Sequence, residues 1–264
     1  MGIDENIEEL EEKLQKTPVN KATEKERARL KSRIAELKEE KQKKQKETEG
    51  TSGYAVKKHG DATIALVGFP SVGKSTLLNK ITNADSETGK YQFTTLEVNP
   101  GMMKYKGVNI QILDVPGLIG GAAEGRGGGT QVLSVVRNAD LVIIMVDPEE
   151  ERKETIEEEL YDAGIRINKS PPDVKVEKKG KGGLKINSTV NLDIGEDTLK
   201  EILQKHGYTN ANVTIREKVD IDRFIDGIMD NRKYVPALKI VNKIDDVENE
   251  RKTELEAEYD LCIS

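Results

Sequence analysis

The stretch Gly68-Phe69-Pro70-Ser71-Val72-Gly73-Lys74-Ser75, followed by Thr76, has the spacing G-x-x-x-x-G-K-S. The run Ala62–Val67 before it is apolar and β-branched, as in a buried parallel strand, and the residues after it have helical spacing. A strand, a glycine loop and a helix in this order direct backbone N–H groups and a positive helix end at a phosphate chain. The stretch therefore predicts a phosphate-binding loop. The alternative, a chance match to a glycine-containing turn, becomes negligible beside the motifs described below.

Three residues of this loop have expected chemical roles. We expect Lys74 to contact the β- and γ-phosphates of a nucleotide and the Ser75 hydroxyl to bind Mg²⁺. Glycine is needed at Gly73 because a side chain there would hold the phosphates away from the backbone.

The composition of the 264 residues bounds the class of protein. Charged residues make up 34% and aromatic residues 4%, with no Trp, so no aromatic-rich platform for bases is apparent. The longest apolar runs have strand length, the N-terminus is polar and acidic, and Asn6 stands where a myristoylation signal has Ser or Thr. The single cysteine, Cys262, excludes an internal disulfide and a Cys-rich metal site. We expect a cytoplasmic protein that makes no membrane contact.

The first 60 residues predict a helical hairpin over residues 3–47, followed by a linker. Their two apolar stripes can pack on each other, which we favour over a free coiled coil. Residues 21–46 hold eleven Lys and Arg against five Glu. This excess predicts that the second helix, residues 24–46, contacts RNA or the ribosome. A solvated helix face explains the same pattern equally well.

From Asp61 onward strands and helices alternate, which predicts an α/β domain with a mainly parallel sheet. The alternation breaks near Gly164, and residues 165–236 are expected to form a small α/β insertion. The two parts of the large domain are then residues 61–164 and 237–264.

A second motif, Asp114-Val115-Pro116-Gly117, follows the predicted strand Ile110–Leu113. Ligands in such sheets bind at the carboxyl ends of strands. The Asp114 carboxylate can hold Mg²⁺ through water, and the Gly117 N–H can contact the γ-phosphate. The pattern D-x-P-G alone is common in turns. Its position after a strand that follows the phosphate loop is what supports a contact with Mg²⁺ and the γ-phosphate.

The tetrapeptide Asn242-Lys243-Ile244-Asp245 follows the predicted strand Ala237–Val241 and points to guanine. The ring N–H and the exocyclic amine of guanine are adjacent donors that the Asp245 carboxylate can accept together, whereas adenine would leave this carboxylate unsatisfied. Asn242 would brace the loop, and the stem of Lys243 would cover one face of the base. In register with the phosphate motifs, this tetrapeptide predicts a guanine-nucleotide site.

Two further segments predict switches. In Tyr91-Gln92-Phe93-Thr94-Thr95-Leu96 a threonine hydroxyl can complete the Mg²⁺ shell only when a γ-phosphate is present, and the residues alone do not decide between Thr94 and Thr95. Phe93 belongs to the same candidate site. The Gly-rich residues 120–129 suit a mobile switch in which Arg126 could neutralise transition-state charge; a solvent-exposed loop arginine is the alternative.

These motifs carry a resemblance to a known family. One set resembles the Obg-type branch of the translation-factor-related GTPases: Gly68–Ser75, Phe93–Leu96, Asp114–Gly117 and Asn242–Asp245. A second set is similar to the DRG (developmentally regulated GTP-binding) family: Asn20–Thr23, Tyr105–Gly107 and Gly164–Arg166. The likeness covers essentially the whole chain. It implies a Ras-like P-loop GTPase domain with an inserted domain of ribosomal-protein type. It also implies Thr95 as the switch Mg²⁺ ligand and a ribosome-associated role with a small regulatory partner protein.

Two positions depart from the pattern of related GTPases. Ras-like GTPases carry Gln after D-x-x-G to orient water, but Leu118 stands here and has no polar atom. The Obg branch shares this replacement, so another group must assist; K⁺ held by carbonyls before Phe93 and by Ser71 is one hypothesis, although related sites would use Asn there. The chain also ends at Ser264, where the family's guanine-contacting S-A motif would begin. We therefore expect a truncated chain without the last helix and the C-terminal TGS domain.

The leading hypothesis is a slow GTPase switch in which GTP and Mg²⁺ order residues 91–97 and 117–129 and create a surface for a partner. Its expected catalytic residues are Lys74, Thr95, Gly117 and Arg126. A nucleotide-gated scaffold that hardly hydrolyses GTP is the first alternative. An ATP-dependent kinase is the second, and Asp245 argues against it.

Overall fold

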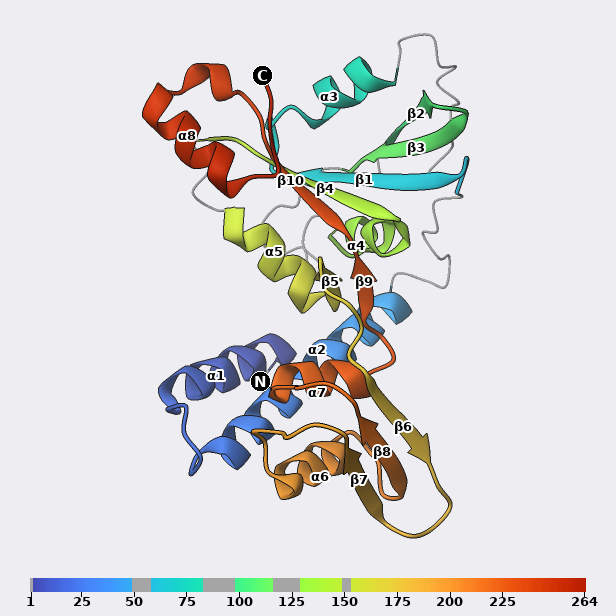
Figure 1. Cartoon of the computed structure of the whole chain (residues 1–264), viewed down its shortest axis with the longest axis vertical. Helices are drawn as coiled ribbons and strands as arrows, with labels where there is room; N and C mark the ends of the chain where they lie inside the picture. Colours follow the sequence, from blue (N-terminus) through green and yellow to red (C-terminus); the bar gives the residue numbers. More distant parts are fainter. Residues whose placement is uncertain (1, 49–57, 83–97, 116–128, 149–152) are drawn as a thin grey trace. The chain divides into compact units, whose positions relative to one another are not determined.

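The computed structural model describes residues 2–48, 58–82, 98–115, 129–148 and 153–264 (Figure 1). The chain folds into two compact units, each built from two separate stretches of sequence. The first unit comprises Met1–Glu49 and Ser170–Arg232, and the second comprises Gly50–Lys169 and Lys233–Ser264. The N-terminal helices and most of the predicted insertion therefore share one unit. The domain boundaries inferred from the sequence stay predictions.

The second unit is organised around a six-stranded sheet with the strand order β11-β10-β4-β1-β3-β2. Its strands are β1 (Ala62–Gly68), β2 (Asn99–Tyr105), β3 (Val108–Asp114), β4 (Leu141–Val146), β10 (Ala237–Val241) and β11 (Leu261–Cys262). Only β2 runs antiparallel to its neighbour, in a hairpin with β3, and the other pairs in this sheet are parallel. The mainly parallel α/β sheet predicted from the sequence is confirmed.

The described helices of this unit are α3 (Lys74–Ile81), α4 (Gly129–Asn138), α5 (Lys153–Asp162) and α8 (Asn249–Glu258), with a short 3₁₀ turn, η2, at Ile244–Asp246. Strand β4 is almost entirely buried along its length, as expected of a parallel strand inside a sheet covered on both faces. Fully buried side chains such as Leu66, Ile112 and Leu160 form the core. Each such side chain contributes roughly 1.5–3 kcal/mol to stability.

A small parallel pair, β5 (Ile165–Ile167) with β9 (Lys233–Val235), belongs to the same unit. It lies where the chain leaves the second unit and returns to it. Asn168 fixes this point, because its side chain donates to the carbonyl of Ala237 at 3.0 Å and accepts from the N–H of the same residue at 2.7 Å. The return of the chain into β10 is thereby held at a defined position.

The first unit combines the N-terminal helices with a three-stranded sheet of order β6-β8-β7. Its elements are α1 (Ile3–Lys16), α2 (Glu24–Thr48), β6 (Val174–Lys178), β7 (Leu184–Ser188), α6 (Glu196–Lys205), β8 (Ala211–Ile215) and α7 (Ile221–Ile228). Helix α2 contacts α1 and also packs on α6 and α7. The predicted hairpin of two packed helices is therefore present, and its second helix also covers the inserted segment.

Glu24 joins α2 to the start of α6. Gly195, the N-cap residue of α6, has no side chain to satisfy the first N–H groups of the helix. The Glu24 carboxylate supplies the acceptor, taking hydrogen bonds from the Gly195 N–H at 2.9 Å and from the Thr198 hydroxyl at 2.7 Å. A residue far away in sequence thus caps α6.

Candidate nucleotide-binding site

Three of the predicted motifs lie at one edge of the six-stranded sheet, at the carboxyl ends of its parallel strands. Leu66 in β1 is in register with Asp114 at the end of β3, and Val241 in β10 is in register with Val146 in β4. The loops that follow β1, β3 and β10 therefore start at the same edge of the sheet (Figure 1). This edge is where parallel sheets bind ligands.

The loop between β1 and α3 has a backbone that few sequences can adopt. Ser71 and Gly73 both have positive φ, 64° and 99°. A Cβ atom added at Gly73 would lie 2.2 Å from the side-chain nitrogen of Asn242, and one added at Gly68 would lie 2.3 Å from the carbonyl oxygen of Met145. Both glycines of the motif are therefore required by the fold itself, beyond the access to phosphate for which the sequence predicts Gly73.

Lys74 begins α3 and is buried, with 7% of its surface exposed. Its ammonium group donates to the carbonyl oxygens of Gly68 at 3.0 Å and Phe69 at 2.9 Å. Burial lowers the pKa of Lys74, and the nearby charge of Asp114 opposes this shift. The loop therefore wraps around the one cation that is expected to hold the phosphates.

Ser75 and Asp114 come from different elements and meet at this edge. The Ser75 hydroxyl in the first turn of α3 donates to the Asp114 carboxylate at the end of β3, over 2.5 Å. Hydroxyl and carboxylate oxygens are the hard ligands that Mg²⁺ prefers, and Mg²⁺ keeps several waters beside one or two protein ligands. The two described residues of the predicted magnesium site therefore fit the ion.

The loop after β10 is tied directly to the phosphate loop. The side-chain nitrogen of Asn242 donates to the carbonyl oxygen of Val72 at 2.8 Å, and its backbone N–H donates to Val146 at 3.0 Å. The predicted bracing role of Asn242 corresponds to this contact. Lys243 has a left-handed backbone, with φ 59°, and the exposed Asp245 lies in the turn η2.

Asp147 is a residue at this edge that the sequence interpretation missed. Its carboxylate lies 2.6 Å from the ammonium nitrogen of Lys243, so it holds the side chain expected to cover the base. It directly follows β4, whose strand is evident in the sequence, and the strand-end rule could have pointed to it. An Asp-Pro pair after a strand is so common in turns that it carries no signal alone.

Ser264 lies next to a residue that contacts the same loop. The N–H of Ile244 donates to the carbonyl of Ile263 at 3.2 Å, and the N–H of Ile263 donates to Val241 at 2.9 Å. The strand β11 thus brings the C-terminal end of the chain beside Asn242–Asp245. The other predicted site residues lie outside the described residues: Phe93, Thr94, Thr95, Gly117, Leu118 and Arg126.

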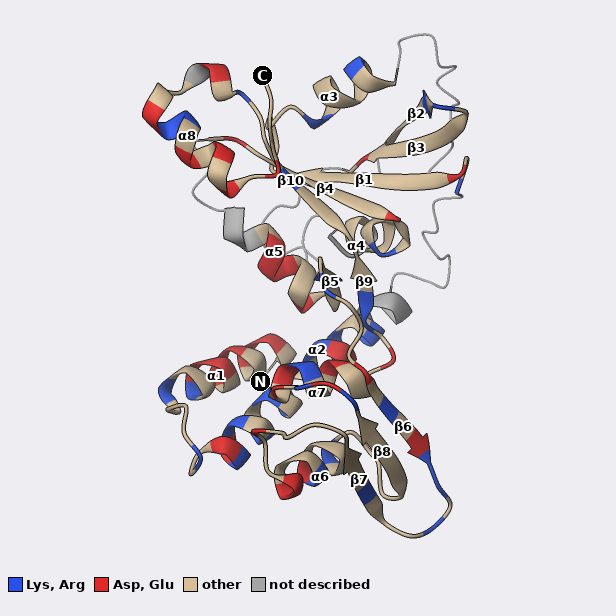
Figure 2. Cartoon of the chain, in the orientation of Figure 1, with Lys and Arg blue, Asp and Glu red and all other residues tan. Residues whose placement is uncertain are grey.

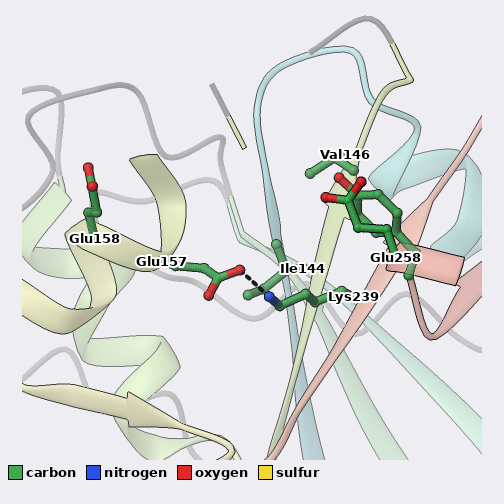
Figure 3. A pocket seen from close by; sticks show the side chains of 7 residues that line it. Ile144, Val146, Glu157, Glu158, Lys239 and Glu258 are labelled. Carbon is green, nitrogen blue, oxygen red and sulfur yellow. Dashed lines mark ion pairs between the residues drawn. The ribbon is translucent and has the colours of Figure 1, made fainter. Parts of the chain in front are cut away.

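A cavity of about 380 Å³ that is separate from the motif residues lies in the second unit (Figure 3). It is lined by Ile144, Val146, Glu157, Glu158, Lys239, Glu258 and Tyr259. Glu157 of α5 and Lys239 of β10 form an ion pair across it at 2.5 Å. No predicted site residue that the structure describes lines this cavity, so the candidate site rests on the convergence of motifs and not on the volume of a pocket.

The basic residues of α2 are largely paired within the first unit. Their acidic partners stand on α1, on α6 and α7, and on α2 itself. The pairs are Lys25–Asp197, Arg29–Glu201, Lys31–Asp222, Arg33–Glu36, Lys38–Glu11, Lys41–Asp4, Lys43–Glu39 and Lys44–Glu40. Arg27 donates instead to the carbonyls of Leu14 and Thr17 at the end of α1. Much of the positive charge counted in the sequence is therefore compensated.

The phosphate loop, the Ser75–Asp114 pair and the Asn-Lys-x-Asp loop on a mainly parallel sheet define the chain as a P-loop GTP-binding protein. Residues 63–179 match the family described as "50S ribosome-binding GTPase", and residues 181–264 match the "C-terminal region of MMR_HSR1 domain". No helix among the described residues has the length and apolar character needed to span a membrane.

Comparison with individual relatives shows to which branch of the GTP-binding proteins the chain belongs. The chain is 56% identical over 249 residues to an uncharacterized GTP-binding protein of Halobacterium salinarum, covering 94% of this chain and 67% of that protein. It is 44% identical over 254 residues to the human Developmentally-regulated GTP-binding protein 2, covering 95% and 70%. It is 40% identical over 262 residues to the Ribosome-interacting GTPase 1 of Saccharomyces cerevisiae, covering 97% and 70%. The chain belongs to the DRG family of Obg-like GTP-binding proteins, and it spans about two thirds of the length of these relatives.

Proposed function

We propose that this protein is a GTP-controlled switch that hydrolyses GTP slowly to GDP and contacts the ribosome in the cytoplasm. The observation that supports it best is the convergence of Lys74, the Ser75–Asp114 pair and the Asn242–Asp245 loop at one sheet edge. These groups match, in order, the phosphates, Mg²⁺ and the guanine base of one nucleotide.

In this proposal the residues of the edge bind and orient the nucleotide. Lys74 holds the β- and γ-phosphates, and Ser75 and Asp114 hold Mg²⁺ together with Thr95. Mg²⁺, when bound, supplies the charge that neutralises the phosphate oxygens as the γ-phosphate leaves. Gly117 contacts the γ-phosphate, so residues 91–97 and 117–129 respond to its presence or loss.

Hydrolysis is proposed to be slow because Leu118 cannot orient a water molecule. The same observation favours a second candidate, a nucleotide-gated scaffold with negligible hydrolysis. Single-turnover hydrolysis of bound GTP separates the two, since a scaffold leaves GTP intact over the lifetime of the complex. Comparing KCl with NaCl at equal ionic strength tests the K⁺ hypothesis for Ser71: several-fold faster turnover in KCl supports it. Equal rates in the two salts favour Arg126, or a residue of the small regulatory partner protein, as the group that neutralises charge in the transition state.

Contact with the ribosome is proposed from the name of the yeast relative and from the description of the matching family. The sequence placed this contact on α2, residues 24–46. Co-sedimentation of the chain with ribosomes in the presence of GDP, a non-hydrolysable GTP analogue or no nucleotide tests it. The proposal expects the GTP-analogue state to bind most tightly, and no sedimentation in any state would contradict it.

The nucleotide assignment has its own test. Fluorescent GDP and ADP are titrated into the purified chain with Mg²⁺ and again with EDTA. The proposal expects GDP to bind at least about a hundredfold more tightly than ADP and to weaken without Mg²⁺. Equal affinity for GDP and ADP would favour the kinase alternative.

A further inference from the structure

Among the described residues of the first unit, the helices pack on one face of the β6-β8-β7 sheet and leave the side chains of the other face exposed or half-buried. The side chains that alternate towards the helices, such as Val176, Ile186 and Val213, pack with α6 and α7 in the core of the first unit. The open face carries Lys175, Glu177, Lys185, Asn187, Asn212 and Thr214, which are exposed or half-buried. An open sheet face made of polar residues is accessible to a partner.

Strand register sets these side chains in two rows across the sheet. Glu177 pairs with Asn212, which pairs with Lys185 on the other side. Lys175 pairs with Thr214, which pairs with Asn187. Each row therefore crosses three strands and offers amide or hydroxyl groups flanked by a lysine. Such groups donate to phosphate oxygens and to ribose hydroxyls.

The loop from β6 to β7 extends this face with more positive charge. Figure 2 shows lysines along β6, the loop and β7. Residues 174–188 contain five Lys and one Glu, a net charge of +4 in a chain of net charge −6. Glu177 is shared between Lys175 at 3.0 Å and Lys179 at 3.7 Å. Among the described residues Lys181 and Lys185 have no acidic partner.

Glycines keep the backbone of this loop accessible. Gly180, Gly182 and Gly183 have no neighbouring atom within 4 Å of a Cβ position, so packing does not explain them. Gly182 and Gly183 have φ of 110° and 72°, which glycine adopts without strain. The loop is thus a lysine-rich turn whose glycines have open space at their Cβ positions.

We propose that this surface, the lysine face (Lys175, Lys179, Lys181 and Lys185 with Asn187, Asn212 and Thr214), binds double-helical RNA. Its lysines can pair with the phosphates of a nucleic-acid backbone, whose regular negative charge does not require exact spacing of the lysines. Its amide and hydroxyl groups can hydrogen-bond to the ribose 2′-hydroxyls in the minor groove of an A-form helix. The face carries no aromatic side chain on which an unpaired base would stack. Helix α2, whose charges are compensated, is not the RNA contact in this proposal.

The inference rests on the proposed ribosome contact, but its test uses RNA alone. A variant of the lysine face replaces Lys179, Lys181 and Lys185 with Gln. A matched control replaces Lys13, Lys16 and Lys200 with Gln. These three are surface lysines of the same unit, each paired with a Glu one helical turn away. Both variants remove three positive charges, and thermal unfolding verifies that each remains folded.

Binding of a labelled RNA duplex of about 20 base pairs is measured by anisotropy between about 50 and 200 mM KCl. We expect the lysine-face variant to bind the RNA about tenfold or more weakly than the parent does. We also expect the slope of the logarithm of its binding constant against the logarithm of salt concentration to become less negative by about 3. The control should stay within about twofold of the parent, because its lysines contact no phosphate. Equal losses in both variants, or no binding by the parent, would overturn the proposal.

Two further measurements distinguish a failure of the RNA assignment from a failure of the proposed GTP switch. A DNA duplex of the same sequence should bind more weakly than the RNA, since it lacks the 2′-hydroxyls; equal affinity would overturn the assignment to RNA. GDP affinity, measured on the same preparations, should be unchanged in both variants because the nucleotide site lies in the other unit. A parent chain that binds RNA but not GDP would refute the proposed switch and leave the lysine face supported.

Discussion

At the scale of single residues, two glycines with positive φ show how the same residue type serves different ends. Gly73 (φ 99°) lies against the side-chain nitrogen of Asn242, whereas Gly107 (φ 85°) turns the β2–β3 hairpin and has no atom within 4 Å of a Cβ position. A left-handed backbone, which would strain other residues, is therefore common to both positions, whereas only Gly73 also has a side chain close to its Cβ position.

Replacing Gly73 with Ala should displace Asn242 and with it the link between the phosphate and guanine loops. We expect GDP affinity to fall by about a hundredfold or more, since both loops must be in place for one nucleotide. Gly107→Ala, the control, should cost about 1 kcal/mol of unfolding free energy and leave GDP affinity unchanged. Isothermal titration with GDP, alongside urea unfolding of both variants, makes the comparison. Equal effects on affinity would contradict the role assigned to Gly73.

The ion pair between Asp147 and Lys243 leads to a second residue-scale prediction. Because the two side chains are 23% and 41% exposed, the pair is worth at most about 1 kcal/mol. Asp147→Asn should therefore weaken GDP binding by about two- to fivefold, mainly through faster dissociation. Glu157→Gln breaks a similar pair with Lys239 in the separate cavity and should have no effect on GDP. A stopped-flow dissociation rate unchanged in Asp147→Asn would refute the positioning role.

At the scale of elements, α2 connects α1 to the inserted segment. Glu24 accepts two hydrogen bonds at the start of α6, and its pKa is lowered. Burial raises the pKa of Glu24, but hydrogen bonds from Gly195, Thr198 and Lys21 outweigh this effect. The ionised carboxylate therefore stabilises the folded state above its unfolded pKa of about 4.3, and this contribution is lost as the pH falls through the lower folded pKa.

Glu24→Gln should lower the unfolding free energy of the first unit by about 1 kcal/mol at pH 7. The difference from the parent should shrink in acid, where the parent carboxylate is also neutral. Glu26→Gln removes the same charge from an exposed position in the same helical turn and serves as the control. Urea unfolding at pH 7 and below pH 4 provides the measurement, and a loss that persists undiminished in acid would show that charge is not the cause.

At the scale of the whole molecule, the sequence predicts local patterns well and long-range partners poorly. The parallel sheet and the motif loops follow from apolar runs and spacing, because strand ends in such sheets share one edge. The association of α2 with the inserted segment could not be predicted, since residues such as Arg29 and Glu201 meet only after folding. For the same reason the lysines of α2 looked like a free basic surface. Asp147 was missed because an aspartate after a strand becomes informative only beside Lys243.

We propose that one edge of the six-stranded sheet binds a guanine nucleotide through Asp245. Asp245 is exposed in the turn η2, beside the loop that Asn242 ties to the phosphate loop, so a base placed there would meet its carboxylate. Asp245→Asn replaces a carboxylate oxygen, an acceptor, with an amide nitrogen, a donor, which would face the exocyclic amine of guanine, also a donor. Xanthine has a carbonyl oxygen at that position, which can accept from the amide.

The most direct measurement is therefore a competition of GDP and XDP for the parent chain and for Asp245→Asn. We expect the variant to bind GDP about ten- to a hundredfold more weakly than the parent does and to gain affinity for XDP. A variant that binds GDP as tightly as the parent and gains nothing for XDP would contradict the guanine site on which the account rests.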